Sequence, residues 1–158
     1  MRRLVGVIRA FIIILVFILC VSFVSCGGKS SARDMLSDFC NLYGASGVIY
    51  SPEVREGEDG YITPRLFSDI YLFYGAPPEN YAVMLNSRTD ISAECGVFLV
   101  DNGAELSMIE EMCRERISAI GADGRGVIIR SGGTLFYSTF ADTERVREIW
   151  YSIIRSHT

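Results

Sequence analysis

The stretch VIIRSGGTLFYSTF, residues 127–140, decides the fold. Two runs rich in apolar and β-branched residues, 127–131 and 134–140, flank the pair Gly132-Gly133. A two-residue glycine turn accommodates the positive φ angles that a tight antiparallel hairpin requires. The spacing therefore predicts a β-hairpin, followed by a helix that Asp142 caps. The apolar residues of that helix repeat at i, i+3, i+4, i+7 and i+8: Val146, Ile149, Trp150, Ile153 and Ile154.

A unit with the same order of elements precedes this hairpin. Residues 81–87 and 94–100 are predicted strands. Asn102, followed three residues later by Glu105, has the pattern of a capping box and predicts the start of a helix. The apolar face of that helix consists of Leu106, Ile109, Cys113, Ile117 and Ile120.

Two further helices are predicted nearer the N-terminus. An apolar stripe at helical spacing starts at Met35, and Gly44 ends it. The second helix begins at Thr63-Pro64, a hydroxyl cap followed by proline at the first helical position, and is expected to end at Gly75. Residues 45–62, which carry a proline and four acids, are expected to form a loop.

These elements predict an α+β fold. We expect an antiparallel sheet of about four strands in ββα-ββα order, with helices packed over one face. Strand 94–100 is apolar on both of its sides, so it should be central, with the N-terminal helices covering its second face. The hairpin 127–140 contains several polar residues, so we expect it to keep one face in solvent.

The first residues have the layout of a bacterial export signal. Arg2, Arg3 and Arg9 precede an apolar run, residues 10–24, and small residues surround Cys26. This order favours a lipoprotein signal, in which Cys26 becomes the lipid-bearing first residue of the mature protein. An uncleaved signal anchor and cleavage with secretion stay open as alternatives. All three place the remaining chain outside the cytoplasmic membrane.

The predicted organisation has three parts. Residues 1–25 are a lipoprotein signal peptide or signal anchor, residues 26–31 a tether, and residues 32–158 a single extracytoplasmic α+β domain. Loss of the signal removes three arginines, so 12 basic residues stay with 19 acidic ones. Such an acidic domain lacks the clustered positive charge that nucleic acid or anionic lipid requires.

The chemistry-bearing residue types are sparse. His157, next to the C-terminus, is the only histidine, which argues against a Ser/His/Asp triad or an activated thiol. Cys40, Cys95 and Cys113 lack metal-ligand spacing, and one disulfide among them stays open in an oxidising compartment. We therefore assign no catalytic residue, metal ligand or cofactor.

Four aromatic residues lie close together in the sequence: Tyr71, Phe73, Tyr74 and Tyr81. Exposed aromatic side chains are typical of interfaces, so these rings are a candidate interaction patch. The alternative is that they pack the second helix onto the sheet.

Two segments carry a resemblance to a known family. They are DIYLFYGAPPE, residues 69–79, and AECGVFLV, residues 93–100, which runs into the helix that contains Glu110, Glu111 and Arg116. Together with the signal, they resemble a small lipoprotein-like family, found mainly in Gram-positive anaerobic bacteria, that is described only as a domain of unknown function. The resemblance covers roughly residues 30–155. It implies a secreted or lipid-anchored domain and carries over no catalytic residue.

The sequence thus predicts a membrane-anchored protein on the extracytoplasmic face of the cell membrane. Its N-terminal lipid or helix would attach the protein to the membrane. An envelope protein or cell-wall component is the expected partner. We expect a non-catalytic binding or interaction module. The alternative is an extracytoplasmic enzyme or enzyme subunit that uses carboxylates on cell-wall material, which requires two acids about 5 to 10 Å apart in a cleft.

Overall fold

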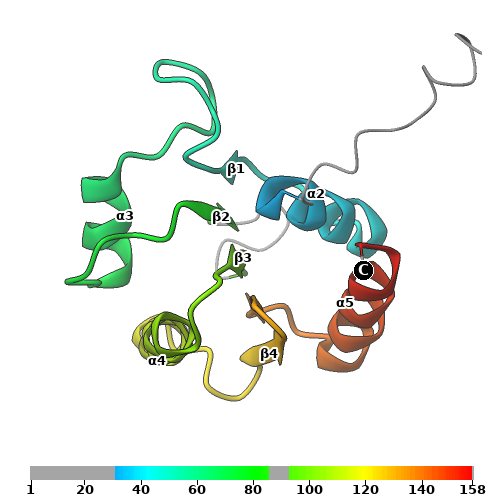
Figure 1. Cartoon of the computed structure of the whole chain (residues 1–158). Helices are drawn as coiled ribbons and strands as arrows, with labels where there is room; N and C mark the ends of the chain where they lie inside the picture. Colours follow the sequence, from blue (N-terminus) through cyan, green and yellow to red (C-terminus); the bar gives the residue numbers. More distant parts are fainter. Residues whose placement is uncertain (1–30, 86–92, 158) are drawn as a thin grey trace, which may run out of the picture.

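A five-stranded antiparallel sheet with the order β1-β2-β3-β5-β4 forms the centre of the molecule (Figure 1). The computed structural model describes residues 31–85 and 93–157. In this part of the chain the elements are α2 (Ala32–Tyr43), β1 (Ile49–Tyr50), α3 (Pro64–Tyr71), β2 (Asn80–Met84), β3 (Cys95–Leu99), α4 (Gly103–Ala119), β4 (Val127–Ser131), β5 (Thr134–Ser138) and α5 (Thr143–His157). The predicted α+β class and antiparallel sheet are confirmed.

The central strand is β3, as its apolar sequence predicts. It pairs with β2 on one side and β5 on the other, so that Val97 lies between Ala82 and Phe136. Glycine at position 96 allows the sheet and its covering side chains to approach closely, because a Cβ there would lie 2.7 Å from the ring of Tyr137. Side chains of β3 alternate between two buried clusters, one on each face of the sheet.

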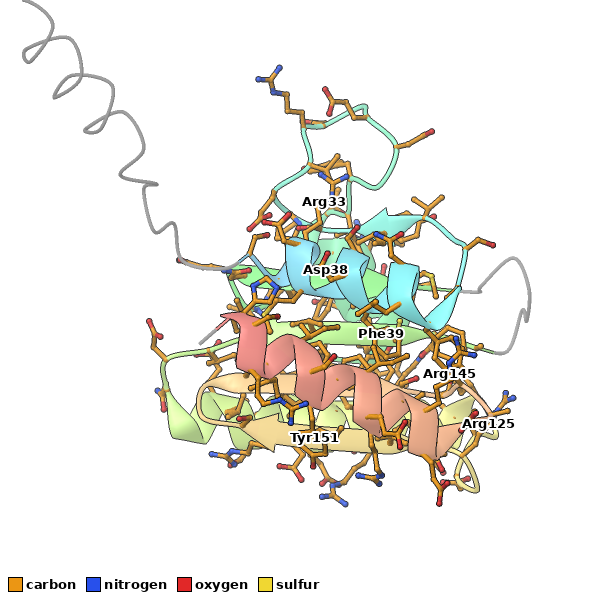
Figure 2. All side chains as sticks on the ribbon, turned by 90° about the vertical axis from the view of Figure 1, so that its right-hand side faces the viewer. Arg33, Asp38, Phe39, Arg125, Arg145 and Tyr151 are labelled. Carbon is orange, nitrogen blue, oxygen red and sulfur yellow. The ribbon has the colours of Figure 1, made fainter. Side chains whose placement is uncertain are left out.

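Helices cover both faces of the sheet. Helices α2 and α5 lie side by side on one face, and α3 and α4 lie on the other (Figures 1 and 2). We expected the two N-terminal helices to share a face, and this is wrong. The ring of Phe39 on α2 packs against Phe136 at 4.8 Å, and Trp150 on α5 stacks on the same ring at 4.2 Å. The stripes of α2 and α5 therefore share one apolar surface.

Two further expectations about the sheet are corrected. The segment 45–62 contains a short strand, β1, whose Ile49 and Tyr50 pair with Met84 and Val83, so the sheet has five strands. The hairpin does not keep a whole face in solvent: β5 is buried on both sides because it lies next to β3. Only β4, at the edge of the sheet, exposes a polar side chain, Arg130.

The helix ends follow the predicted caps with one exception. Thr63 Oγ1 accepts a hydrogen bond from the Leu66 N–H at 3.1 Å, and Asp142 Oδ1 accepts one from Arg145 at 3.0 Å. The exception is α3, which ends at Tyr71 instead of Gly75. Leu72 takes the left-handed conformation, with φ 51°, and caps the helix through its N–H to the Ser68 carbonyl.

Candidate functional site

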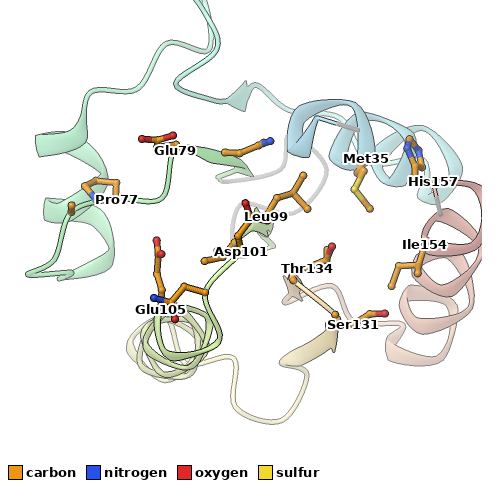
Figure 3. Close-up of a pocket in the computed structure, with 16 residues that line it drawn as sticks. Met35, Pro77, Glu79, Leu99, Asp101, Glu105, Ser131, Thr134, Ile154 and His157 are labelled. Atoms are coloured by element: carbon orange, nitrogen blue, oxygen red, sulfur yellow. The ribbon is translucent and has the colours of Figure 1, made fainter. Parts of the chain in front are cut away.

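An open hollow of about 1150 Å³ lies at one end of the sheet (Figure 3). The ends of four strands line it: Asn80 begins β2, Leu99 ends β3, and the tip of the β4–β5 hairpin lies beside them. The first turns of α2 and α4 and the last turn of α5 contribute Met35, Glu105 and Ile154 to its walls. The segment between α3 and β2 completes the lining.

Carboxylates give this hollow its chemical character. Glu79 precedes β2, Asp101 follows β3, and Glu105 lies in the first turn of α4. Asn102 caps α4, because its Oδ1 accepts a hydrogen bond from the Ala104 N–H at 2.9 Å. This cap fixes the start of α4 and therefore places Glu105 in its first turn. Figure 3 shows these acid side chains around the opening and not inside a closed cavity. The hollow thus suits a cationic or hydroxyl-rich ligand.

The single histidine also lines the hollow. His157 Nε2 lies 3.2 Å from the Asp38 carboxylate, and this contact joins the end of α5 to α2. The first residues of the described chain lie at the same end of the molecule. The N–H of Ala32 donates to Asn80 Oδ1 at 3.0 Å, and Asn80 lines the hollow. The chain therefore enters the domain at the mouth of the hollow.

A buried ion pair between Glu94 and Arg116 is the strongest polar cluster away from the hollow. Arg116 reaches both oxygens of the Glu94 carboxylate, with Nε–Oε1 and Nη2–Oε2 distances of 2.8 Å. The Glu94 side chain is 3% exposed and that of Arg116 20%. Arg116 also donates to the carbonyl of Ile70 at 3.3 Å, so the guanidinium links α4, α3 and the start of β3.

Two tyrosines extend this polar cluster into the core. The Tyr71 and Tyr137 hydroxyls lie 2.6 Å apart, and Tyr137 donates to Glu94 Oε1 at 3.1 Å. Burial raises the pKa of both phenols well above the usual value, and the negative charge of Glu94 adds to the effect. Both hydroxyl groups therefore stay protonated and can donate hydrogen bonds. The arrangement fixes the Glu94 carboxylate in place, because both of its oxygens accept hydrogen bonds from the protein.

The predicted aromatic patch is not formed as a group of four exposed rings. Tyr71 and Tyr81 are buried and pack with Phe67 at centroid distances of 4.7 and 4.5 Å. Phe73 is half-buried and packs edge-on against the same ring. Tyr74 alone is fully exposed. Helical spacing brought Tyr71 toward the sheet, whereas the early end of α3 left Tyr74 outside it.

The cysteines lie on both faces of the sheet. Cys40, Cys95 and Cys113 are buried free thiols. Cys40 and Cys95 belong to the cluster beneath α2 and α5, and Cys113 to the one beneath α3 and α4. The predicted lipid-bearing residue, Cys26, lies outside the described residues.

Sequence reasoning missed the roles of Glu94 and Arg116. The signal was present, because Glu94 is an acid at the start of a strand that is otherwise apolar on both sides. A charged residue in such a position is seldom buried without a partner. No periodicity argument identifies that partner, which lies on another element 22 residues away.

Within residues 31–85 and 93–157, no group of three or more His, Cys, Asp or Glu side chains could hold a metal ion. Across the same residues, no helix has the length and apolar character needed to cross a membrane.

Comparisons with models of protein families, with curated proteins and with solved structures return no match. The fold defines a three-layer α+β domain with an antiparallel sheet between two pairs of helices. The resemblance to a lipoprotein-like family stays a prediction.

Proposed function

We propose that this chain is a membrane-anchored extracytoplasmic protein whose domain is a non-catalytic binding or interaction module. In this proposal residues 1–25 are the export signal, Cys26 carries the lipid, and residues 26–31 are the tether. The observation that supports it most directly is the position of Ala32, whose N–H is held by Asn80 at the mouth of the hollow.

The length of the tether limits where the hollow can lie. Ser31 lies five positions after Cys26, and a fully extended chain over five residue steps spans about 17 Å. A lipid on Cys26 therefore keeps the mouth of the hollow within about 2 nm of the membrane surface. The partner we expect is accordingly an envelope protein or a cell-wall component that lies close to the membrane. The acidic lining opposes binding of nucleic acid or anionic lipid.

Intact mass tests the anchor. We would express the full chain in a bacterial host that exports it and measure the mass of the membrane-extracted protein. A mass of residues 26–158 plus a diacylglyceryl group supports the proposal, and Cys26→Ser should abolish both cleavage and lipid. A mass of residues 1–158 would show a single-pass signal anchor. A chain without lipid in the soluble fraction would contradict membrane anchoring.

Photo-crosslinking tests the binding module. A photoreactive side chain at Glu105, on the wall of the hollow, should form adducts with a partner on intact cells. The matched control is Gly124, which lies in the α4–β4 turn at the other end of the sheet and has open space around it. Equal labelling from both positions would contradict a partner site at the hollow.

One observation favours a carboxylate-dependent enzyme as the second candidate. Glu79, Asp101 and Glu105 line one hollow, and pairs of acids perform glycoside hydrolysis. The test is release of soluble fragments from purified cell-wall glycan. The binding module predicts no release. Release that Glu105→Gln abolishes, and that the exposed control Glu144→Gln keeps, would identify the enzyme instead.

A further inference from the structure

Three sulfur atoms meet between α2 and the sheet. Cys40, in the last turn of α2, places its Sγ 3.8 Å from the Sδ of Met84 on β2. Met84 lies directly opposite Cys95 on β3 in the antiparallel register. Cys40 and Cys95 also belong to the same buried cluster. A helix residue and a residue of the central strand, 55 positions apart, therefore both lie next to the Met84 side chain.

We propose that Cys40 and Cys95 form a disulfide in the mature protein and thereby join α2 covalently to β3. The inference rests on the proposed extracytoplasmic placement, because disulfides persist in oxidising compartments. Cys113 cannot take part, since it lies in the cluster on the opposite face of the sheet. The three cysteines of the described domain thus form one pair and one buried thiol.

The chemistry is thiol–disulfide exchange with a disulfide-bonded dithiol oxidant of the cell envelope. Cys40 is the attacking thiol because it is the more accessible of the two, whereas Cys95 is fully buried and its burial raises its pKa. The Cys40 thiolate attacks one sulfur of the oxidant and displaces the other as a thiolate. Cys95 then loses its proton and displaces the remaining oxidant sulfur. The two cysteines lose two protons and two electrons, and the oxidant takes them up as its dithiol form.

The position of this bond would let it carry force between the anchor and the sheet. Helix α2 is the first described element after the proposed tether, so any pull on the anchor reaches the domain through α2. Without the bond, α2 is held by packing and by single contacts such as that of Ala32 with Asn80. With the bond, the load passes directly to the strand at the centre of the sheet. The enclosed loop contains β1, α3 and β2.

The test is the thiol state of the full chain isolated from the envelope of an exporting host. Cells are quenched with an alkylating reagent under denaturing conditions without reductant, and the protein is analysed by mass spectrometry. We expect one alkylated cysteine, Cys113, and a linked peptide pair containing Cys40 and Cys95. The intact mass should equal that of the reduced chain plus one alkyl group, less about 2 Da for the two hydrogens lost. Cys113→Ala should keep the link and Cys95→Ala should abolish it. Reduction should lower the melting temperature of the wild type by roughly 10 °C and leave that of Cys95→Ala unchanged.

Alkylation of all three cysteines, or a bridge that includes Cys113, would overturn the proposal. A second measurement then shows which premise failed. The purified reduced protein is incubated with oxidised glutathione: formation of the bridge there would mean that the geometry is right and the compartment wrong. No bridge with glutathione would mean that the two thiols cannot be joined. The location of the chain is read separately from its intact mass and membrane fraction, so failure of the anchor is distinguishable from failure of the disulfide.

Discussion

Replacement of Arg116 by methionine removes the guanidinium that neutralises Glu94 and keeps most of the aliphatic stem. The Glu94 carboxylate then stays buried with one remaining side-chain donor, the Tyr137 hydroxyl at 3.1 Å. Both charge-assisted bonds of 2.8 Å are lost, together with the bond to the carbonyl of Ile70. We expect a lower free energy of unfolding and no change of fold.

The size of the effect follows from burial. Removal of one partner of a buried ion pair costs about 3–5 kcal/mol, because the other charge is left uncompensated. Arg116 is 20% exposed, and water already screens part of its interaction. The expected loss is therefore at the lower end, about 3 kcal/mol.

Chemical denaturation followed by the fluorescence of Trp150, which is buried against Phe136, measures this stability. The matched control is Arg114→Met, two residues away on the same helix, whose ion pairs with Glu110 and Glu111 are exposed. The control should change stability little. The double variant Glu94→Gln/Arg116→Met has no buried charge and should recover a good part of the loss.

Two results would refute this reasoning. A loss below about 1 kcal/mol for Arg116→Met would mean that the pair behaves like an exposed one. A double variant that is less stable than Arg116→Met would mean that the uncompensated charge of Glu94 is not the cause. In that case the contact of Arg116 with α3 would carry the stability instead.

Three further predictions concern the core. Tyr137→Phe removes hydrogen bonds to Tyr71 and Glu94 and should cost about 1–3 kcal/mol in denaturant unfolding. Burial raises the pKa of Tyr81 to about 12 and raises the pKa of Tyr71 and Tyr137 well above the usual value, so these phenols bind protons more tightly in the folded state. Stability should therefore be constant below about pH 10 and fall as the pH rises beyond it, which unfolding at pH 8 and pH 11 checks; equal stability at both would contradict the burial. Gly96→Ala places a Cβ 2.7 Å from the Tyr137 ring and should lower stability by about 1–3 kcal/mol, whereas Gly124→Ala, which meets no atom within 4 Å, should not.

Local patterns predicted the elements of this fold well. The Gly132-Gly133 pair marked the hairpin, and β4 and β5 lie on either side of it. The caps at Thr63 and Asp142 accept the expected backbone hydrogen bonds, and Asn102 caps its helix through the N–H of Ala104 instead of that of Glu105. Such signals act over three or four residues, so one sequence is enough to read them.

Tertiary placement could not be read in the same way. The apolar stripe of α2 does not indicate that the helix packs beside α5. Both faces of the sheet are apolar, so such a stripe could pack on either face. The short strand β1 forms by pairing with the free edge of β2. Its two residues are too few to show a periodic pattern in the sequence. The sequence predicted the end of α3 at Gly75, because glycine is the usual helix terminator, but Leu72, three residues earlier, caps the helix. The hollow is assembled from the ends of several elements and therefore has no sequence motif.

The two faces of the sheet differ in role. One contains the polar contacts that stabilise the domain, and the other carries the helix that follows the proposed tether. The face beneath α3 and α4 contains the ion pair of Glu94 with Arg116, and its hydrogen bonds fix those helices to the sheet. The face beneath α2 and α5 is apolar and holds the thiols of Cys40 and Cys95, so packing and a few single polar contacts hold α2 there unless a disulfide forms. That helix follows the proposed tether and borders the hollow through Met35. A partner bound at the hollow would pull on the same helix as the anchor, and a covalent link to β3 strengthens the domain at this point.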